Sequence, residues 1–417
     1  MLRSMFSGVS GLRIHQTRMD VIANNIANVN TTAFKSSRVN FQEIYSQTLK
    51  SASSPANGGG RGGTNPSQVG LGISIASIDV LHMNGSAQRT DKATDLAIEG
   101  DGFFTVSDGS NQYYTRAGNF DMDRSGNLVT SGGLKLMGWL NDPITQQVET
   151  TGEPKEINLA NLVLPPKATS SITFEGNLDN RAQTGNGDIV PYTVSVFDAK
   201  GTEHKLTYTF TKSAAANEWK YAVTDPTGPT GLTIAAGTGT LTFKTDGSFD
   251  TTALDTPLMT VTVPGTDDIV IQPSFTADKF TQYAGDTLVK AAAVDGCRKG
   301  ELNGINIDKS GNVTGVYNNG EFRVEATLAL ARFTNPGGLE RMGDNLFTVS
   351  TNSGFPDLGA AGQDGRGIIN PGSLEMSNVD LAKEFTDMIS TQRGFQANSR
   401  IITTSDEMLQ ELVNLKR

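Results

Sequence analysis

The sequence predicts a mainly β protein whose two chain ends are α-helical. Helical periodicity is confined to the two ends. From about Gly70 to Gly372 the chain is rich in Thr, Val, Gly, Asn and Asp, with short alternating runs between turn residues. A chain of 417 residues has room for roughly two to four compact units. We therefore expect discontinuous β domains in the middle and end helices that pair as a coiled-coil-like inner domain.

The N-terminal helix is predicted from apolar residues that recur with a 4,3,4,3 spacing, interrupted at Gln16. This first half of the seam consists of Met5, Val9, Leu12, Met19 and Ile26, with Ala23 between the last two. Such a narrow seam is typical of contact between helices, including helices of different subunits.

The C-terminal helix is predicted from the same spacing, with more polar interruptions. This second half of the seam consists of Leu381, Phe385, Met388, Phe395, Ile402, Leu409 and Val413. Ser377 and Asp380 form an S-x-x-D start signal. Two other interpretations stay open: the helices pack on each other within one monomer, or each lies on the β body as an ordinary amphipathic helix.

Turn chemistry predicts the hairpins of the β region. MDRSGNLV and IDKSGNVTGV each place Asp three residues before Gly, and KTDGSF places Asp directly before Gly, in each case between apolar runs. A further hairpin is predicted in PYTVSVFDAKGTEHKLTYTF, which turns at Ala199, Lys200 and Gly201. Residues 51–68 are rich in Gly, Ser, Asn and Pro and are expected to form a flexible or extended connector.

Catalytic, cofactor and metal motifs find little support. Gly58, Gly60 and Gly63 match G-x-G-x-x-G, but no strand precedes them closely. The run from Asp121 resembles a calcium loop, yet Gly132 stands where Glu is needed. No serine-hydrolase elbow, Walker loop or H-E-x-x-H motif is present. We therefore predict no enzyme, no catalytic residue, no cofactor and no metal site.

Composition narrows the possible partners. The chain has 34 basic and 44 acidic residues, with a net charge of -10, which disfavours nucleic acid. No stretch approaches the roughly 20 apolar residues of a membrane helix, and the start lacks an apolar run of signal-peptide length. The single cysteine, Cys297, cannot form an internal disulfide; Arg298 and Lys299 beside it could lower its pKa, but an ordinary thiol is expected.

Three blocks of the sequence resemble one family. SGVSGLRIHQTRMDVIANNIANVNTTAFK (7–35) resembles the N-terminal signature of the bacterial flagellar rod, hook and hook-associated proteins, and GSLEMSNVDLAKEFTDMISTQRGFQANSRIITTSDEMLQELVNL (372–415) resembles the C-terminal one. DLAIEGDGFFTV with YYTRAGNFDMDRSGNLVTSGG is similar to the body domain that hook and distal-rod proteins share. The core of the N-terminal motif is Ala23, Asn24, Asn25, Ile26, Ala27 and Asn28.

The resemblance implies a division into domains. The end helices (1–33 and 377–417) would be the polymerisation domain, and residues 34–70 a connector with an extended loop. A discontinuous β body (71–145 and 285–376) would carry an inserted outer β domain at 146–284. About 140 residues separate the two body blocks, which favours the hook type of subunit over the distal-rod type. The connector resembles an insertion of distal-rod proteins, so a distal rod subunit is the alternative, and a β-rich surface adhesin a further one.

The resemblance also implies a function. The chain would be a structural subunit that polymerises into a flexible, curved tube, which transmits motor torque from rod to filament. Its partners would be copies of itself, the flagellar rod, the hook cap, the hook–filament junction proteins and the type III export apparatus. It would reach the extracellular flagellum without a cleaved signal peptide, and would neither bind nucleic acid nor insert into a membrane.

Overall fold

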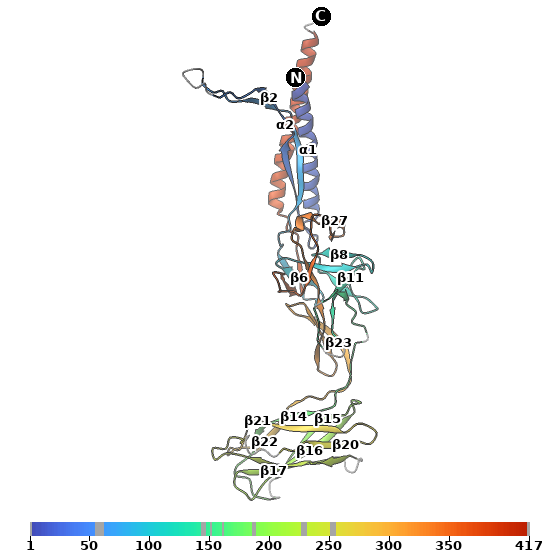
Figure 1. The fold of residues 1–417 in the computed structure, drawn as a ribbon, viewed down its shortest axis with the longest axis vertical. Coiled ribbons are helices and arrows are strands. Elements are labelled where there is room, and N and C mark those ends of the chain that lie inside the picture. Colours follow the sequence, from blue (N-terminus) through green and yellow to red (C-terminus); the bar gives the residue numbers. More distant parts are fainter. Residues whose placement is uncertain are drawn as a thin grey trace. The chain divides into compact units, whose positions relative to one another are not determined.

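The computed structural model describes residues 2–54, 62–142, 147–150, 152–160, 162–185, 189–226, 232–250 and 256–414. The chain forms two compact units. Unit 1 comprises Met1–Ala160, Asn306–Thr314 and Val324–Arg417, and unit 2 comprises Asn161–Ile305 and Gly315–Arg323. The expected class, mainly β with paired end helices, is confirmed (Figure 1).

The two end helices belong to unit 1. Helix α1 spans Leu2–Ala27 and helix α2 spans Leu381–Asn414. Asp380 caps α2, because its carboxylate accepts hydrogen bonds from the N–H groups of Ala382 (2.9 Å) and Lys383 (3.3 Å). The predicted start signal is wrong at Ser377, whose hydroxyl accepts from the N–H of Val379 before the helix begins.

The segment after α1 is a β ribbon. Strand β1 (Ser37–Glu43) pairs antiparallel with β4 (Ile73–Val80), and β2 (Ser46–Lys50) pairs with β3 (Ser67–Gly70). An extended connector was one of the two forms expected for residues 51–68, and their described part fits it: Ser53 and Thr64 form an isolated antiparallel bridge, and Ser67 and Gln68 belong to β3. The flexibility of this segment stays a prediction. The strand pairing was not predicted, because alternation of side chains over only four to eight residues is a weak signal among so many Ser, Asn and Gly residues. The Gly58 and Gly60 positions lie outside the described residues.

The body of unit 1 is an antiparallel sheet with the strand order β25-β11-β7-β8-β28-β27. Its core packs Phe103, Tyr114, Phe333, Leu339 and Phe347 together. The remaining strand pairs are β30 with β6 and β31 with β5. The body strands are β5 (Ala87–Arg89), β6 (Leu96–Glu99), β7 (Phe103–Ser107), β8 (Gln112–Thr115), β9 (Phe120–Met122), β10 (Leu128–Thr130), β11 (Lys135–Leu140), β12 (Lys155–Glu156), β26 (Leu330–Arg332), β27 (Glu340–Gly343), β28 (Leu346–Thr348), β29 (Asp357–Gly359), β30 (Ile368–Pro371) and β31 (Ser373–Glu375), with the 3-10 helix η1 (Pro336–Gly338). Three strands are divided between the two units: β23 (Gly300–Ile307), β24 (Asn312–Tyr317) and β25 (Phe322–Leu328).

Unit 2 is a β-sandwich with one shared core. A five-stranded sheet (β18-β20-β21-β14-β22) and a four-stranded sheet (β15-β16-β17-β19) enclose aromatic residues such as Phe174, Tyr208 and Trp219. Residues 288–294 were predicted to belong to the body. They form strand β22, which pairs with β14, and therefore lie in unit 2. The strands are β13 (Val163–Leu164), β14 (Ser171–Asn177), β15 (Val190–Phe197), β16 (Glu203–Lys212), β17 (Glu218–Thr224), β18 (Thr233–Ala235), β19 (Thr238–Thr242), β20 (Met259–Thr262), β21 (Ile269–Thr281) and β22 (Leu288–Val294).

The predicted turns are present. Gly126, Gly201, Gly247 and Gly311 all have φ between 77° and 83°, the left-handed region that glycine adopts without strain. In the turn that resembled a calcium loop, the Asp123 carboxylate accepts the N–H (2.7 Å) and side-chain amide (2.8 Å) of Asn127. The acidic residue is thus used to close a hairpin.

Candidate functional site

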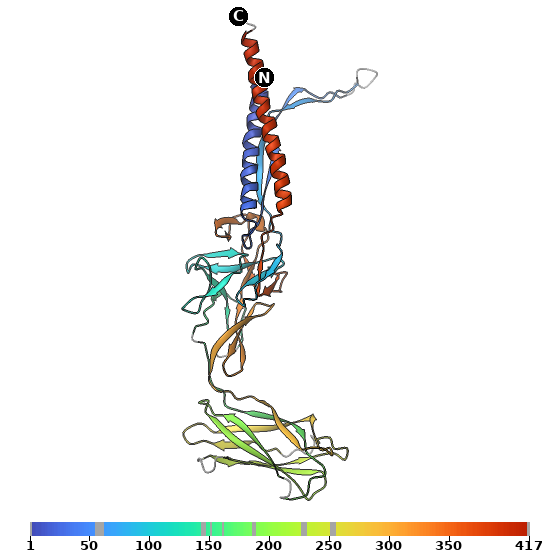
Figure 2. The same cartoon turned by 180° about the vertical axis from the view of Figure 1, so that it is seen from behind.

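The two end helices pack antiparallel through small residues (Figures 1 and 2). A Cβ at Gly11 would lie 2.8 Å from the Asn398 side chain, and one at Gly394 would lie 2.7 Å from the His15 ring. At Gly8 the nearest atoms belong to Asn398 and Ile402. Glycine at these positions lets the two helices approach closely. The contact stripe therefore has little apolar character.

The predicted seam overlaps this contact stripe at Ile402, whose side chain lies beside Gly8. None of its twelve residues is buried. Val9, Leu381, Phe385 and Val413 are exposed, and the others are partly buried: Met5, Leu12, Met19, Ile26, Met388, Phe395, Ile402 and Leu409. Most of the seam therefore lies beside, and not within, the contact between the two helices of one chain, and its role in polymerisation stays a prediction. The spacing of apolar residues predicted the seam, but it could not predict which surface covers the seam.

The two halves of the seam lie on one side of the helix pair. At about 100° per residue, each half is rotated roughly 70° to 90° from the contact stripe of its own helix. Because the helices are antiparallel, these rotations point to the same side. The ribbon lies on the opposite side: the Ile73 N–H donates to the Ser10 hydroxyl, and the Phe41 ring packs edge-on against His15. Figure 2 shows the side of the helix pair away from the ribbon. The isolated chain therefore presents one long, partly apolar face.

The family motif at the end of α1 holds the ribbon to the helices. Asn25 is 1% exposed. Its amide donates to the Ser37 carbonyl (2.9 Å) and to Glu384 of α2 (3.2 Å), and its oxygen accepts the Ser37 N–H (3.0 Å). Asn28 donates to the carbonyl (2.9 Å) and side chain of Asn24 near the end of the helix. Ala23 and Ala27 are exposed, and Ile26 is partly buried.

A second asparagine, which sequence reasoning missed, closes the same ribbon end. Asn378 accepts the Ser36 N–H (2.8 Å) and donates to the Leu81 carbonyl (2.8 Å). Its amide thus takes the place of a ladder hydrogen bond between the two strands. The sequence offered one signal: Asn378 lies inside the C-terminal block, just before the helix.

A buried ion cluster joins the two points where the end segments leave the body. The Lys35 ammonium lies 2.5 Å from the Glu375 carboxylate, and both side chains are almost fully buried. Lys35 also donates to the Met83 carbonyl (2.7 Å), and Arg116 lies 3.6 Å from Glu375. Burial lowers the pKa of Lys35, an effect that Glu375 opposes. One carboxylate therefore neutralises part of two buried positive charges.

His82 packs against this cluster, between Phe103 and Phe347. Burial, together with the positive charges of Lys35, Arg116 and Arg341, lowers the pKa of His82 from 6.5 to about 4. The unfolded chain therefore binds a proton more readily than the folded one. Neutral His82 contributes stability above about pH 6.5 that is lost as the pH falls towards 4.

This loss predicts a pH dependence of unit 1. Its free energy of unfolding should fall by up to about 1.4 kcal/mol per pH unit between pH 6 and pH 4 through His82 alone. Urea unfolding can be followed through Trp139 in a Trp219→Phe background. The His82→Phe variant should lose less stability over this range, whereas His204→Gln, in unit 2, should leave the slope unchanged. An identical slope with and without His82 would contradict the assignment.

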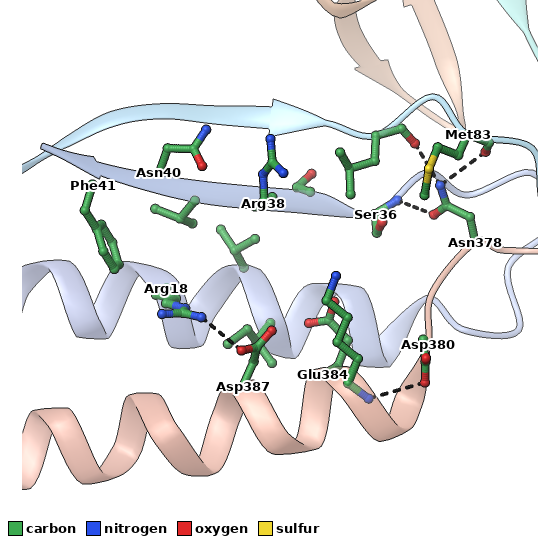
Figure 3. A pocket seen from close by; sticks show the side chains of 16 residues that line it. Arg18, Ser36, Arg38, Asn40, Phe41, Met83, Asn378, Asp380, Glu384 and Asp387 are labelled. Carbon is green, nitrogen blue, oxygen red and sulfur yellow. Dashed lines mark hydrogen bonds and ion pairs between the residues drawn. The ribbon is translucent and has the colours of Figure 1, made fainter.

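A cleft of about 610 Å³ lies between the β1–β4 ribbon and the two end helices (Figure 3). Arg18 of α1 and Asp387 of α2 point toward one another across it and form an ion pair of 3.1 Å. Burial raises the pKa of Glu384, which accepts the Asn25 amide. Val39 and Phe41 of β1 add apolar surface.

The other chemistry-bearing residues form no centre within the described part of the chain. No group of three or more His, Cys, Asp or Glu residues there could hold a metal ion. Cys297 is a free, partly exposed thiol whose backbone pairs with that of Lys167. Among the described helices, none is long and apolar enough to span a membrane.

Family models match four parts of the chain. "Flagella basal body rod protein" matches residues 5–35, and "Flagellar hook protein FlgE/F/G D1 domain" matches 97–178. "Flagellar basal body protein FlaE D2 domain" matches 179–297, and "Flagellar basal body rod FlgEFG protein C-terminal" matches 370–415.

Full-length relatives carry two names. The flagellar hook protein FlgE of Borreliella burgdorferi is 40% identical over 454 residues, and covers 100% of both chains. FlgE of Escherichia coli is 31% identical and covers 98% of each chain. The flagellar basal-body rod protein FlgG of Bacillus subtilis is 32% identical over 100% of each chain. A solved structure, Helicobacter pylori FlgE2, has a TM-score of 0.50 at 14% identity and covers 69% of this chain and 100% of its own, which supports the fold.

Proposed function

The chain belongs to the flagellar hook protein family, and we propose that it is a structural subunit that polymerises into the bacterial flagellar hook, a flexible curved tube that transmits torque from rod to filament. The family is structural. The observation that carries the proposal is the exposed face of the helix pair, where Phe385 is 50% exposed and Val413 is 67% exposed. Exposed apolar surface of this extent is typical of an interface. A second copy is the partner that a polymer supplies.

Electron microscopy of the assembled, purified chain tests this function. We expect curved tubes. Straight rods would support the alternative, a distal rod subunit. This alternative is consistent with the similarity to the basal-body rod protein FlgG of Bacillus subtilis. Failure to form any tube under conditions in which the chain is folded would argue for a non-polymerising protein such as an adhesin.

The remaining partners follow from the same proposal. The tube would join the rod at one end and the hook–filament junction proteins at the other, and would grow beneath a hook cap. We infer export through the type III apparatus without a cleaved signal, followed by folding at the tip outside the cell. Fixing the end segments costs conformational entropy, which burial between subunits would offset.

The β2–β3 hairpin is a second surface that we assign to subunit contact. Strand alternation puts Tyr45, Val69 and Leu71 on one face, and Leu49 lies at the bulge between Thr48 and Lys50; each of these four side chains is at least 40% exposed. A lone two-stranded hairpin is marginally stable in water, so this face requires a covering partner. Neighbouring subunits would provide it.

The hairpin should therefore become more ordered on assembly. Hydrogen exchange at residues 46–50 and 67–70 should be fast in the monomer and slowed at least tenfold in tubes, since each hydrogen bond contributes only about 0.5 to 1.5 kcal/mol. The variant Tyr45→Ser/Leu49→Ser should reduce this protection. A matched change on the polar face, Thr48→Ser/Gln68→Ser, should not. Equal exchange rates in monomer and tube would mean that the hairpin has no subunit contact.

A further inference from the structure

The outer edge of β1 is closed by side-chain amides, but only in part. In the register that pairs Ser37 with Val80, the Leu81 N–H donates to the Ser36 carbonyl, so Ser37 and Val39 direct their N–H and C=O groups away from β4. Asn25 satisfies both groups of Ser37. Within the described residues, no hydrogen bond reaches the outward groups of Val39, which line the cleft of Figure 3. The outward N–H and C=O groups of Val39 could therefore bind one further side-chain amide, as those of Ser37 bind Asn25.

Around this cleft the acidic side chains are paired within the chain, whereas two basic side chains are exposed. Its acidic residues already have internal partners: Asp387 pairs with Arg18, Glu384 accepts from Asn25, and Asp380 caps α2. Lys383 is exposed and makes no ion pair with any described residue. Arg38 is also exposed, with only a 3.4 Å contact to Asp79. The cleft therefore offers two cations and an unpaired strand edge to a partner.

The far end of the helix pair offers matching groups. Gly8 lies level with Asn398 to Ile402, so α2 continues past the start of α1 by roughly eight residues, or about 12 Å. Both figures show the C-terminus beyond the N-terminus at this end. The overhang, which we define as residues 407–414, carries two carboxylates, two amides and exposed apolar side chains: Glu407, Glu411, Gln410, Asn414, Met408 and Val413.

We propose that the overhang of one copy docks into the cleft of a second copy, with Asn414 on the Val39 edge and Glu411 at Lys383. This contact rests on the proposed function and specifies where its subunits meet. The overhang cannot reach the cleft of its own chain, because about 20 helical residues, or some 30 Å of rigid α2, separate them. A contact between two different surfaces is heterologous, and where its rotation does not close into a ring it repeats along an open-ended assembly such as a tube.

A charge exchange tests the ion pair. Lys383→Glu and Glu411→Lys should each raise the critical concentration for assembly of the full chain roughly tenfold. The double variant should return to within about threefold of the wild-type value. Lys220→Glu, an exposed change in unit 2, should have no effect. A double variant that assembles no better than the weaker single variant would overturn the ion pair.

A cross-link tests the position. In a Cys297→Ser background, Arg38→Cys together with Asn414→Cys should give intermolecular disulfides in tubes and none in dilute monomer. The pair Arg38→Cys with Arg400→Cys, at a site distant from the overhang, should give none. Tubes without the first cross-link would overturn the docking contact alone. A wild-type chain that formed no tubes would overturn the proposed function and this contact with it.

Discussion

Replacing Glu375 with leucine should lower the free energy of unfolding of unit 1 by about 3 to 5 kcal/mol. The replacement removes the one carboxylate that faces both Lys35 and Arg116, at 2.5 Å and 3.6 Å. Lys35 would remain buried without its counter-charge, and Arg116 would keep only the field of Asp101. An uncompensated buried charge costs several kcal/mol. Urea unfolding, followed through Trp139 in a Trp219→Phe background, measures this loss.

The partner residue sharpens this prediction. Lys35→Met should cost less than Glu375→Leu, because Arg116 still faces the carboxylate. The double variant should cost less than the sum of the two single changes, since the pair acts as a unit. Arg89→Ala breaks a fully exposed ion pair with Asp91 and should change stability by less than about 1 kcal/mol. Additive costs at Lys35 and Glu375 would mean that the two charges are not coupled.

This cluster could not be predicted from the sequence. Lys35 and Glu375 are 340 positions apart, and neither belongs to a motif that demands a partner. A charged residue in isolation is far more often solvated than buried. Only the fold brings together the chain entering the body after α1 and the chain leaving it before α2. The resemblance to a family named the neighbouring Asn25, but it gave no role for that side chain.

The helices and hairpins could be predicted because their signals are local. Apolar residues at helical spacing and Asp-x-x-Gly turns depend on neighbours within a few positions. The packing of α1 on α2 could not be predicted, because Gly8, Gly11 and Gly394 allow close approach through the absence of a side chain. A hydrophobic pattern records large side chains, and here the large side chains mark the surface that stays uncovered in one chain.

That distinction separates folding from assembly in this molecule. The inner contact of the helix pair uses glycine, Asn398 and the Arg18–Asp387 ion pair, all of which a single chain supplies. Apart from Ile402, which lies beside Gly8, the seam is turned away from this contact, and four of its residues are exposed. Removing the seam should therefore abolish assembly with little effect on the body, whereas removing the buried cluster should unfold the body first.

The seam can be tested by a change of charge alone. Leu381→Asp together with Phe385→Asp should abolish tube formation, because an interface would have to bury two carboxylates without partners. The matched control is Ser390→Asp with Ala397→Asp, two exposed positions on α2 outside the seam. The control should assemble, and circular dichroism should be similar for both variants. Wild-type tube yield from the Leu381/Phe385 variant would contradict the role of the seam.

Deleting residues 1–33 together with 377–417 should have the largest effect of all, a complete loss of tubes from a chain that remains folded. The truncation keeps Lys35 and Glu375, so the buried ion pair still closes the base of the body, and it keeps the cores of both units. It removes the whole seam, Asn25 and Asn378. The β1–β4 ribbon should then fray at the end that those amides hold, while the body strands stay protected from hydrogen exchange. Sedimentation should give a monomer and circular dichroism a β-rich spectrum, and tubes seen by electron microscopy of the truncated chain would show that the β units polymerise without the helices.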